Sequence, residues 1–298
     1  MPSGIITKGI GGFYYVTTPE AIYECKARGI FRKDGLTPLP GDRVLMSVVS
    51  ETDKTGSIDE ILPRESQLVR PAVANVNQVV VVMAVKSPEP DLVLLDKMLV
   101  TIEDKGLDAV ICINKIDLDE GNRCEEILDT YRNTGYRMVM TSSKANTGLD
   151  QLKGMLADRI TVFAGQSGVG KSTILNRIVN MQVMKTGEVS EKIERGKHTT
   201  RHAELIKLDT GGYLVDTPGF SSYELTDVEP ERLQLYFPEF DKHLGRCRFT
   251  GCSHISEPDC CVKAALNEGL ISSGRYQRYV QLFNVLKQEK DYKRGKKT

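Results

Sequence analysis

The chain has 298 residues, of which 40% are hydrophobic and 27% charged, values typical of a folded globular protein rather than a disordered one. It carries 40 basic and 40 acidic residues, and this net charge of zero excludes a histone-like polycation, although a local basic patch remains compatible with it. The longest strongly apolar run, residues 79–85, is far shorter than the ~20 residues of a membrane-spanning helix. Because no secretory leader is recognised either, we expect a cytoplasmic protein of two or three domains.

The first 66 residues predict a small β-barrel or sandwich, because short apolar stretches alternate there with turn residues. The stretches that predict strands are residues 13–16, 22–27, 44–49 and 58–62. Five aromatic side chains of this segment either stack on nucleic-acid bases or fill the core: Phe13, Tyr14, Tyr15, Tyr23 and Phe31. A boundary is expected at residues 63–66.

After residue 70, apolar strands alternate with helices. The strands are predicted at residues 76–85, 107–113, 136–140 and 160–164, and the helices at residues 91–105, 120–133 and 149–156. This alternation predicts an α/β domain with a parallel sheet and helices on both faces. Sites in such sheets lie beyond the carboxyl ends of the strands, which is where the polar motifs of this chain occur.

A phosphate-binding loop follows the strand at residues 160–164 and opens a helix. It matches the pattern GxxxxGK[ST] at every position, and one more polar residue continues it: Gly165, Gln166, Ser167, Gly168, Val169, Gly170, Lys171, Ser172 and Thr173. The glycines let backbone N–H groups surround phosphate oxygens, and the helix N-terminus favours anions. We expect Lys171 to reach the β- and γ-phosphates and the Ser172 hydroxyl to ligate Mg²⁺.

The sequence DTPG follows a further apolar strand at residues 212–215, about 45 residues after the phosphate loop. Alone, it is compatible with an ordinary turn. After a phosphate loop, the Asp216 carboxylate is expected to hold Mg²⁺, and the Gly219 N–H to meet the γ-phosphate.

A base-recognition motif, NKID, follows the strand at residues 107–113. An ionised carboxylate only accepts hydrogen bonds, so Asp117 can take both the N1–H and the amino group of guanine, whereas adenine presents an acceptor. Asn114 either bonds the base edge or ties loops together, and the Lys115 stem can cover the ring face. The next strand ends at three residues whose N–H groups can meet the guanine O6: Ser142, Ser143 and Lys144. Together these features predict GTP rather than ATP.

The order of these motifs is unusual, because ordinary small GTPases begin with the phosphate loop, whereas here it follows the base-recognition motifs and DTPG comes last. With this circular permutation the chain resembles the RsgA family (also called YjeQ or YloQ), GTPases that act in assembly of the small ribosomal subunit. The resemblance covers essentially the whole chain. It implies an RNA-binding OB-fold at residues 1–66, a permuted P-loop GTPase domain at residues 67–228, and a mostly helical zinc-binding domain at residues 229–298.

A cluster of metal-ligand residues lies in the last of these segments. Cys247, Cys252 and His254, with either Cys260 or Cys261, offer three thiolates and an imidazole, which suits a structural, tetrahedral Zn²⁺. Adjacent cysteines rarely ligate the same ion, and the family pattern implies Cys260 as the fourth ligand, which leaves Cys261 to packing. The remaining cysteines are expected to be ordinary buried or half-buried residues: Cys25, Cys112 and Cys124.

Hydrolysis poses a problem, because Phe220 stands where Ras-like enzymes carry the Gln that orients the attacking water. We therefore expect slow intrinsic turnover that a partner stimulates. The polar stretch at residues 185–202 is a candidate switch loop. In it Thr200, in preference to Thr199, is the expected second Mg²⁺ ligand, and the neighbouring His198 either orients water or is a loop residue that contacts RNA.

Charge is distributed unevenly: residues 1–66 are net −1, residues 67–228 net −3 and residues 229–298 net +4. The basic end is either a solvated tail or a contact for phosphate-rich surfaces. The resemblance implies a small-subunit partner with its rRNA, Mg²⁺ with GTP, and one Zn²⁺ per chain. Nothing in the sequence requires a dimer, so a monomer is expected. The alternatives are a GTP-dependent switch acting on non-ribosomal RNA and a phosphotransferase.

Overall fold

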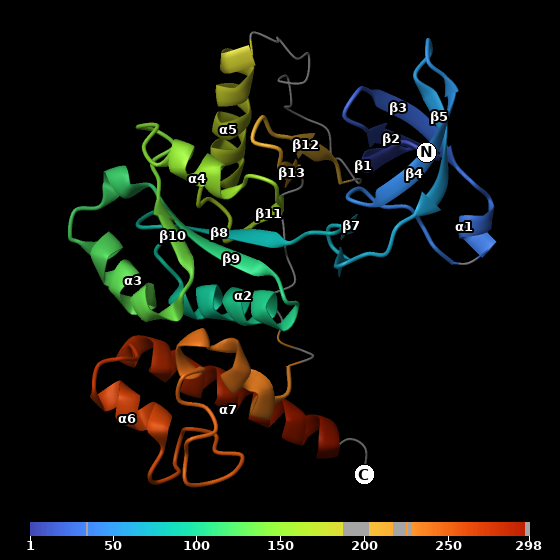
Figure 1. Ribbon diagram of the computed structural model, residues 1–298. Coiled ribbons are helices and arrows are strands. Elements are labelled where there is room, and N and C mark those ends of the chain that lie inside the picture. The colour runs from blue at the N-terminus through green and yellow to red at the C-terminus, as the bar shows by residue number, and fades with distance from the viewer. Residues whose placement is uncertain (34, 187–202, 217–224, 226–227, 296–298) are drawn as a thin grey trace. The chain divides into compact units, whose positions relative to one another are not determined.

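A computed structural model of the chain describes residues 1–33, 35–186, 203–216, 225 and 228–295 (Figure 1). The chain divides into two compact units, of which the first comprises residues 1–80, 149–164 and 171–222, and the second residues 81–148, 165–170 and 223–298. The second unit therefore contains the NKID motif, the glycines of the phosphate loop and the whole C-terminal segment. Among the described helices, none combines the length and the apolar character needed to cross a membrane.

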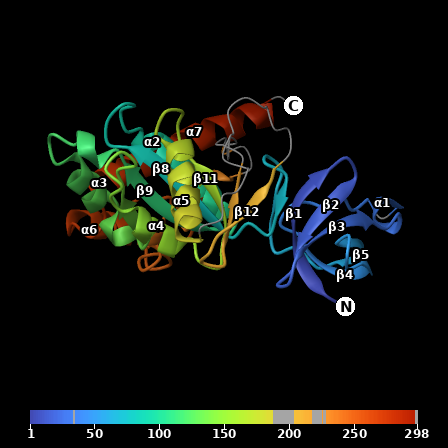
Figure 2. The same ribbon diagram turned by 90° about the horizontal axis from the view of Figure 1, so that it is seen from above.

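The N-terminal segment forms a closed five-stranded barrel with the strand order β1-β2-β3-β5-β4 (Figure 1, Figure 2). Its strands are β1 (Ser3–Ile10), β2 (Phe13–Thr17), β3 (Ile22–Ala27), β4 (Arg43–Ser50) and β5 (Thr55–Ile61), and α1 (Ile30–Lys33) follows β3. Strands β3 and β5 pair in parallel, whereas the other pairs are antiparallel. A five-stranded barrel of this kind is that of the OB-fold, so the predicted fold of this segment is confirmed.

The burial of the five aromatic side chains shows which of them fill the barrel core and which stay accessible for base stacking. Tyr23 and Phe31 are buried among the apolar residues Ile6, Val16 and Met46, so these two rings fill the core. Phe13 and Tyr15 are half-buried, and Tyr14 is half-buried and packs against this core.

Six later strands form one sheet in the order β10-β9-β8-β11-β13-β12. They are β8 (Gln78–Ala84), β9 (Asp108–Asn114), β10 (Arg137–Met140), β11 (Ile160–Ala164), β12 (Leu205–Lys207) and β13 (Tyr213–Val215); the pair β6 (Gln67–Leu68) and β7 (Val73–Ala74) precedes them. The seven residues of β8 are all buried, as its unbroken apolar run predicts.

The expectation of a wholly parallel sheet is corrected at one edge. Strand β12 pairs antiparallel to β13, because a tight hairpin turn joins the two, in which the Leu208 N–H donates to the Gly212 carbonyl at 2.7 Å. Gly211 adopts the positive φ of 86° that such a turn requires. Strand β12 is only three residues long and ends in a lysine, so its hydrophobic pattern was too weak to predict it.

Helices follow the strands as the sequence predicts: α2 (Leu92–Asp104), α3 (Arg123–Tyr131), α4 (Leu149–Met155) and α5 (Lys171–Thr186), with 3₁₀ turns η1 (Ile116–Leu118) and η2 (Arg132–Thr134). The side chain of Asp91 caps α2 by accepting from the Leu94 N–H at 2.9 Å. Helix α5 extends to Thr186 and so includes the first two residues of the predicted switch loop.

The C-terminal segment is mostly helical, as predicted, and comprises η4 (Pro230–Tyr236), η5 (Pro238–Phe240), α6 (Cys261–Asn267) and α7 (Ser273–Gly295). Its core is aromatic: the Tyr279 ring stands edge-on to the rings of Phe237 and Phe240, with centroids 5.1 and 4.9 Å apart. Val100 of α2 belongs to the same buried cluster. The C-terminal segment and α2 therefore share one hydrophobic core.

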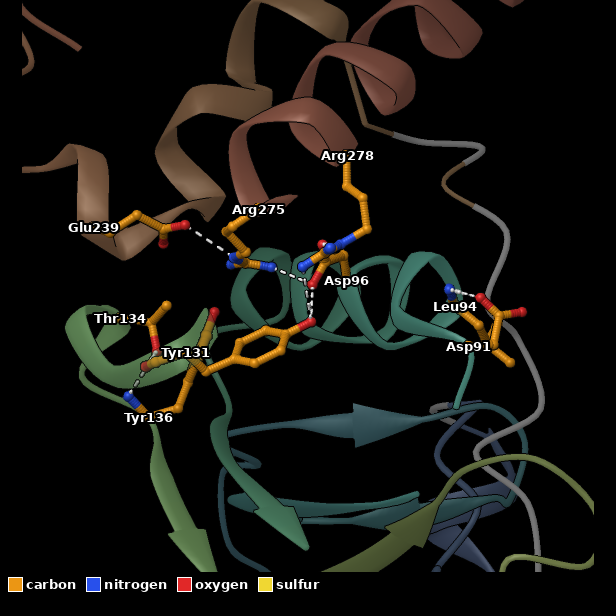
Figure 3. A network of polar contacts seen from close by, with 9 residues as sticks. All are labelled: Asp91, Leu94, Asp96, Tyr131, Thr134, Tyr136, Glu239, Arg275 and Arg278. Atoms are coloured by element: carbon orange, nitrogen blue, oxygen red, sulfur yellow. Dashed lines mark hydrogen bonds and ion pairs between the residues drawn. The ribbon is translucent and has the colours of Figure 1, made fainter. Parts of the chain in front are cut away.

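A buried ionic network joins the C-terminal segment to α2 and α3 (Figure 3). The Arg275 guanidinium of α7 donates to Asp96 Oδ1 at 2.5 Å and to Glu239 Oε1 at 2.9 Å. Asp96 also accepts from Arg278 Nε and from the Tyr131 hydroxyl, both at 2.5 Å. The side chains of Asp96 and Arg275 have no exposed surface, so protein groups alone compensate their charges.

Candidate nucleotide site and metal cluster

The phosphate loop joins the end of β11 to the first residue of α5, Lys171. Its glycines have backbone conformations that other residues avoid, with φ of 131° at Gly165, 81° at Gly168 and 100° at Gly170. A Cβ on Gly165 would lie 2.0 Å from the Val82 carbonyl oxygen. The loop therefore needs glycine for its shape, and it leads into a helix N-terminus that favours a phosphate anion.

Three polar residues follow the loop at the start of α5: Lys171, Ser172 and Thr173. Burial lowers the pKa of Lys171, because its ammonium group has lost part of its hydration. An anionic phosphate would compensate this loss. Ser172 and Thr173, in the first turn of α5, are exposed.

Asn114, at the end of β9, ties two loops together and is buried, with 1% of its surface exposed. Its amide nitrogen donates to the Val169 carbonyl of the phosphate loop at 2.8 Å. Its amide oxygen accepts from the hydroxyls of Thr141 and Ser143 at 3.1 and 3.3 Å. Of the two roles open to this residue, the structure therefore contains the loop-tying one.

Asp117 presents its carboxylate at the surface just after the left-handed residue Lys115, whose φ is 61°. The Ser142 hydroxyl donates to Asp117 Oδ1 at 2.5 Å and accepts from the Ala145 N–H at 3.0 Å, which fixes the direction of the carboxylate. The Lys115 ammonium donates to the Ser87 carbonyl. An oriented group that only accepts hydrogen bonds matches the two adjacent donors of guanine.

Replacing Gly170 with alanine is expected to weaken GTP binding about 10- to 100-fold. The new Cβ would lie 2.4 Å from Asn114 Nδ2, and the positive φ would add strain of about 1–3 kcal/mol, so Asn114 would move away from the phosphate loop. Equilibrium titration with a fluorescent GTP analogue measures the change. Gly154→Ala is the control, because a Cβ there meets no neighbouring atom. Equal affinity in the two variants would contradict this account.

Part of the predicted site lies outside the described residues. Asp216 directly follows β13, as predicted, and its backbone N–H donates to the Glu204 carbonyl at 2.8 Å. The rest of DTPG, with Gly219, lies outside the described residues, as do Phe220, His198, Thr199 and Thr200. Their roles stay predictions.

The four predicted metal ligands come together. The ligand atoms of Cys247, Cys252, His254 and Cys260 all lie within 4.8 Å of one another. His254 Nδ1 is 3.3 Å from Cys260 Sγ and 3.6 Å from Cys247 Sγ, and these two sulfurs are 4.0 Å apart. Around a tetrahedral Zn²⁺, neighbouring ligand atoms would be about 3.5–3.8 Å apart. The residues therefore fit a closed, four-coordinate metal site.

Cys261 lies outside this group, although it adjoins a member of it. Its thiol donates to the Arg246 carbonyl at 3.0 Å at the start of α6. The three isolated cysteines are buried, as predicted: Cys25, Cys112 and Cys124.

Residues that the sequence did not single out support the metal cluster. Gln234 Oε1 lies 2.7 Å from His254 Nε2, and the Tyr276 hydroxyl donates to the His254 carbonyl at 2.7 Å. Burial opposes ionisation of Glu257, but hydrogen bonds from the hydroxyl and N–H of Ser253 and from the N–H of Ile255 lower its pKa to about 2. No local pattern distinguishes a glutamine in this role from a surface glutamine.

Comparison with known proteins agrees with this geometry. The RsgA GTPase family matches residues 61–226, and the RsgA N-terminal domain family matches residues 3–58. A Ruminiclostridium cellulolyticum protein named small ribosomal subunit biogenesis GTPase RsgA is 56% identical over 300 residues, covering 100% of this chain and 98% of its own. A protein of the same name from Alkaliphilus metalliredigens is 49% identical, covering 98% of this chain and 100% of its own.

Two solved structures have the same fold. YjeQ from Thermotoga maritima is 39% identical with a TM-score of 0.82, covering 96% of this chain and 98% of its own. YloQ, described as a circularly permuted GTPase, is also 39% identical with a TM-score of 0.82, covering 97% of this chain and 96% of its own. With its barrel, its permuted motifs and its full-length relatives, the chain belongs to the RsgA family and is a GTP-hydrolysing enzyme.

Proposed function

We propose that this GTPase binds the small (30S) ribosomal subunit and assists its late maturation, and that the subunit stimulates hydrolysis of GTP to GDP and phosphate. The observation that carries the proposal is the 56% identity, over the whole chain, to a protein named for small-subunit biogenesis. In this proposal the protein acts as a monomer in the cytoplasm, where its partner is found. Its parts are an RNA-binding domain at residues 1–66, the GTPase domain at residues 67–228 and a zinc-binding domain at residues 229–298.

The nucleotide site acts by positioning and charge. Lys171 contacts the β- and γ-phosphates, and the Gly219 N–H meets the γ-phosphate. Ser172, Thr200 and Asp216 would hold Mg²⁺, which neutralises phosphate charge when it is bound. What supports these roles is the glycine loop, the partly dehydrated Lys171 and the position of Asp216 at the end of β13.

Selection of guanine rests on residues from two loops. Asp117 accepts from the base, Ser142 orients that carboxylate, and Asn114 holds the phosphate loop beside them. The aliphatic part of the Lys115 side chain covers the face of the guanine ring, and the N–H groups of Ser143 and Lys144 face the guanine O6. His198 takes the role of the missing glutamine and orients the attacking water. The support for His198 is its place beside Thr199 and Thr200 in a chain with Phe220 after DTPG.

Contacts with ribosomal RNA are assigned mainly to the C-terminal segment. Residues 229–298 carry a net charge of +4, whereas the barrel is net −1. Each phosphate neutralised by a lysine or arginine releases counterions, so this contact weakens as salt is raised. The Zn²⁺ in this segment is structural, because four protein ligands leave no position open for a catalytic water.

GTP turnover with and without purified small subunits tests the proposal. We expect strong stimulation by small subunits and none by large subunits or bulk RNA. His198→Ala should lose the stimulated turnover while GTP binding is unchanged. Equal stimulation by any RNA would favour a switch on non-ribosomal RNA, and phosphate transfer to another molecule would indicate a phosphotransferase. Unchanged stimulated turnover in the His198 variant would reject that role alone.

A further inference from the structure

The two ring nitrogens of His254 face different partners. Nδ1 points to the thiol groups of Cys247 and Cys260, at 3.6 and 3.3 Å, and Nε2 lies 2.7 Å from Gln234 Oε1 in η4. A nitrogen that ligates a metal must carry a lone pair rather than a proton. If Nδ1 is the ligand, the proton resides on Nε2, where it can donate only to Gln234.

A second hydrogen bond fixes which way the glutamine amide points. Gln234 Nε2 donates to the Glu231 carbonyl at 3.0 Å, so the amide oxygen must face the imidazole. If the amide were turned round, its oxygen would face the Glu231 carbonyl oxygen, and both atoms only accept hydrogen bonds. Its NH₂ group would then face the protonated Nε2 of His254, and both groups would be donors. The hydrogen-bond pattern therefore specifies a single arrangement of the Gln234 side chain.

The ring has little freedom to find another partner. His254 is 2% exposed, and the Phe240 ring stands edge-on to it at a centroid distance of 6.0 Å. Its backbone is held by the Tyr276 hydroxyl at 2.7 Å, in a left-handed conformation with φ of 61°. Loss of the Gln234 oxygen would remove the hydrogen-bond partner of this N–H in a ring that is almost wholly buried.

We infer that Gln234 is a positioning residue for the metal site: its amide oxygen holds the proton of His254 on Nε2 and so presents Nδ1 to the ion. This inference rests on the proposed structural zinc. An uncharged acceptor suits the site, because three thiolates and one imidazole already give a Zn²⁺ complex a charge of −1. The contact between Gln234 and His254 also joins the metal site to η4, and Tyr236 of η4 donates to Asp104 of α2 at 2.5 Å.

Chelator competition on the full-length chain measures the effect on zinc affinity. Gln234→Leu, which keeps the volume and removes the acceptor, is expected to bind zinc about 10- to 100-fold more weakly. Gln234→Glu retains an acceptor for the Nε2–H and should keep affinity closer to wild type than the leucine variant. Tyr236→Phe is the matched control, because it removes a hydrogen bond from the same turn without touching His254.

Nitrogen NMR of the zinc-loaded wild-type chain shows which ring nitrogen of His254 carries the proton, a property that a change in packing alone would not alter. We expect the His254 proton on Nε2 and the metal on Nδ1. A proton on Nδ1, wild-type affinity in Gln234→Leu, or equal weakening in Tyr236→Phe would overturn the inference about Gln234 while zinc binding stands. A wild-type chain that binds no zinc would instead reject the zinc proposal and this inference with it.

Discussion

Replacing Arg275 with methionine is expected to lower the free energy of unfolding by about 3–5 kcal/mol, because it leaves the carboxylates of Asp96 and Glu239 buried with less compensation. The guanidinium also lies over the Phe237 ring, 4.3 Å from its centroid, so the variant loses that contact as well. Urea unfolding at neutral pH, followed by circular dichroism, measures the loss in the transition that includes the C-terminal segment.

The control for this variant is Arg248→Met, which breaks an ion pair with Asp259 whose two side chains are 67% and 64% exposed. Exposed pairs contribute about 0–1 kcal/mol, so this change should be small. In Asp96→Asn with Arg275→Met, the combined loss should be smaller than the sum of the single losses, because the two charges are direct partners. Equal stability of the Arg275 and Arg248 variants would show that the buried network contributes no more than a surface pair.

Replacing Cys260 with serine is expected to abolish zinc binding, whereas Cys261→Ser should retain one zinc per chain. Of these two cysteines, only Cys260 has its sulfur within the ligand group. The thiol of Cys261 donates instead to the Arg246 carbonyl, a bond that a serine hydroxyl can replace. Metal content of the purified variants, measured by atomic emission, separates the two adjacent positions. Zinc retained by Cys260→Ser and lost by Cys261→Ser would reverse the ligand assignment.

Zinc loss should also destabilise the C-terminal segment. A metal present at 1,000 times its Kd stabilises a folded state by about 4 kcal/mol, so chelation should lower the unfolding midpoint of the wild type and of Cys261→Ser. Chelation should have no effect on Cys260→Ser. An unfolding curve of the wild type that is insensitive to the chelator would contradict a structural role for the metal.

The nucleotide site could be predicted from the sequence because its signals are local. The phosphate loop and NKID are short continuous motifs, and each follows an apolar strand that fixes its place at the end of that strand. The residues of the metal-ligand cluster were also predictable, since Cys247 to Cys260 span fourteen residues with recognisable spacing. Strands β8, β9 and β11 are apolar throughout or nearly so, and their prediction was correct.

The buried network could not be predicted, because its partners are remote in sequence. Asp96 and Arg275 are 179 positions apart, and each is one of several charged residues in its helix, where a charge usually faces solvent. Gln234 was missed for the same reason: its partner His254 lies 20 positions away, and a glutamine in a polar turn carries no signal. Strand β1 was also not delimited, since its sequence SGIITKGI does not alternate regularly.

Closure of the N-terminal barrel restricts the kind of partner that it can bind. Each of its five strands pairs with two neighbours, although β1 and β4 pair only through residues 3–5 and 43–45 and Lys8 of β1 also bridges Glu204. The described barrel therefore offers little unpaired strand edge to an added strand. An extended peptide that binds by adding a strand to a sheet therefore finds few unpaired backbone groups on it. A ligand of the barrel would instead meet side chains and loops, such as the half-buried rings of Phe13 and Tyr15. The proposed RNA partner suits such a surface, because the bases of a single-stranded polynucleotide stack on rings and its backbone needs no strand pairing.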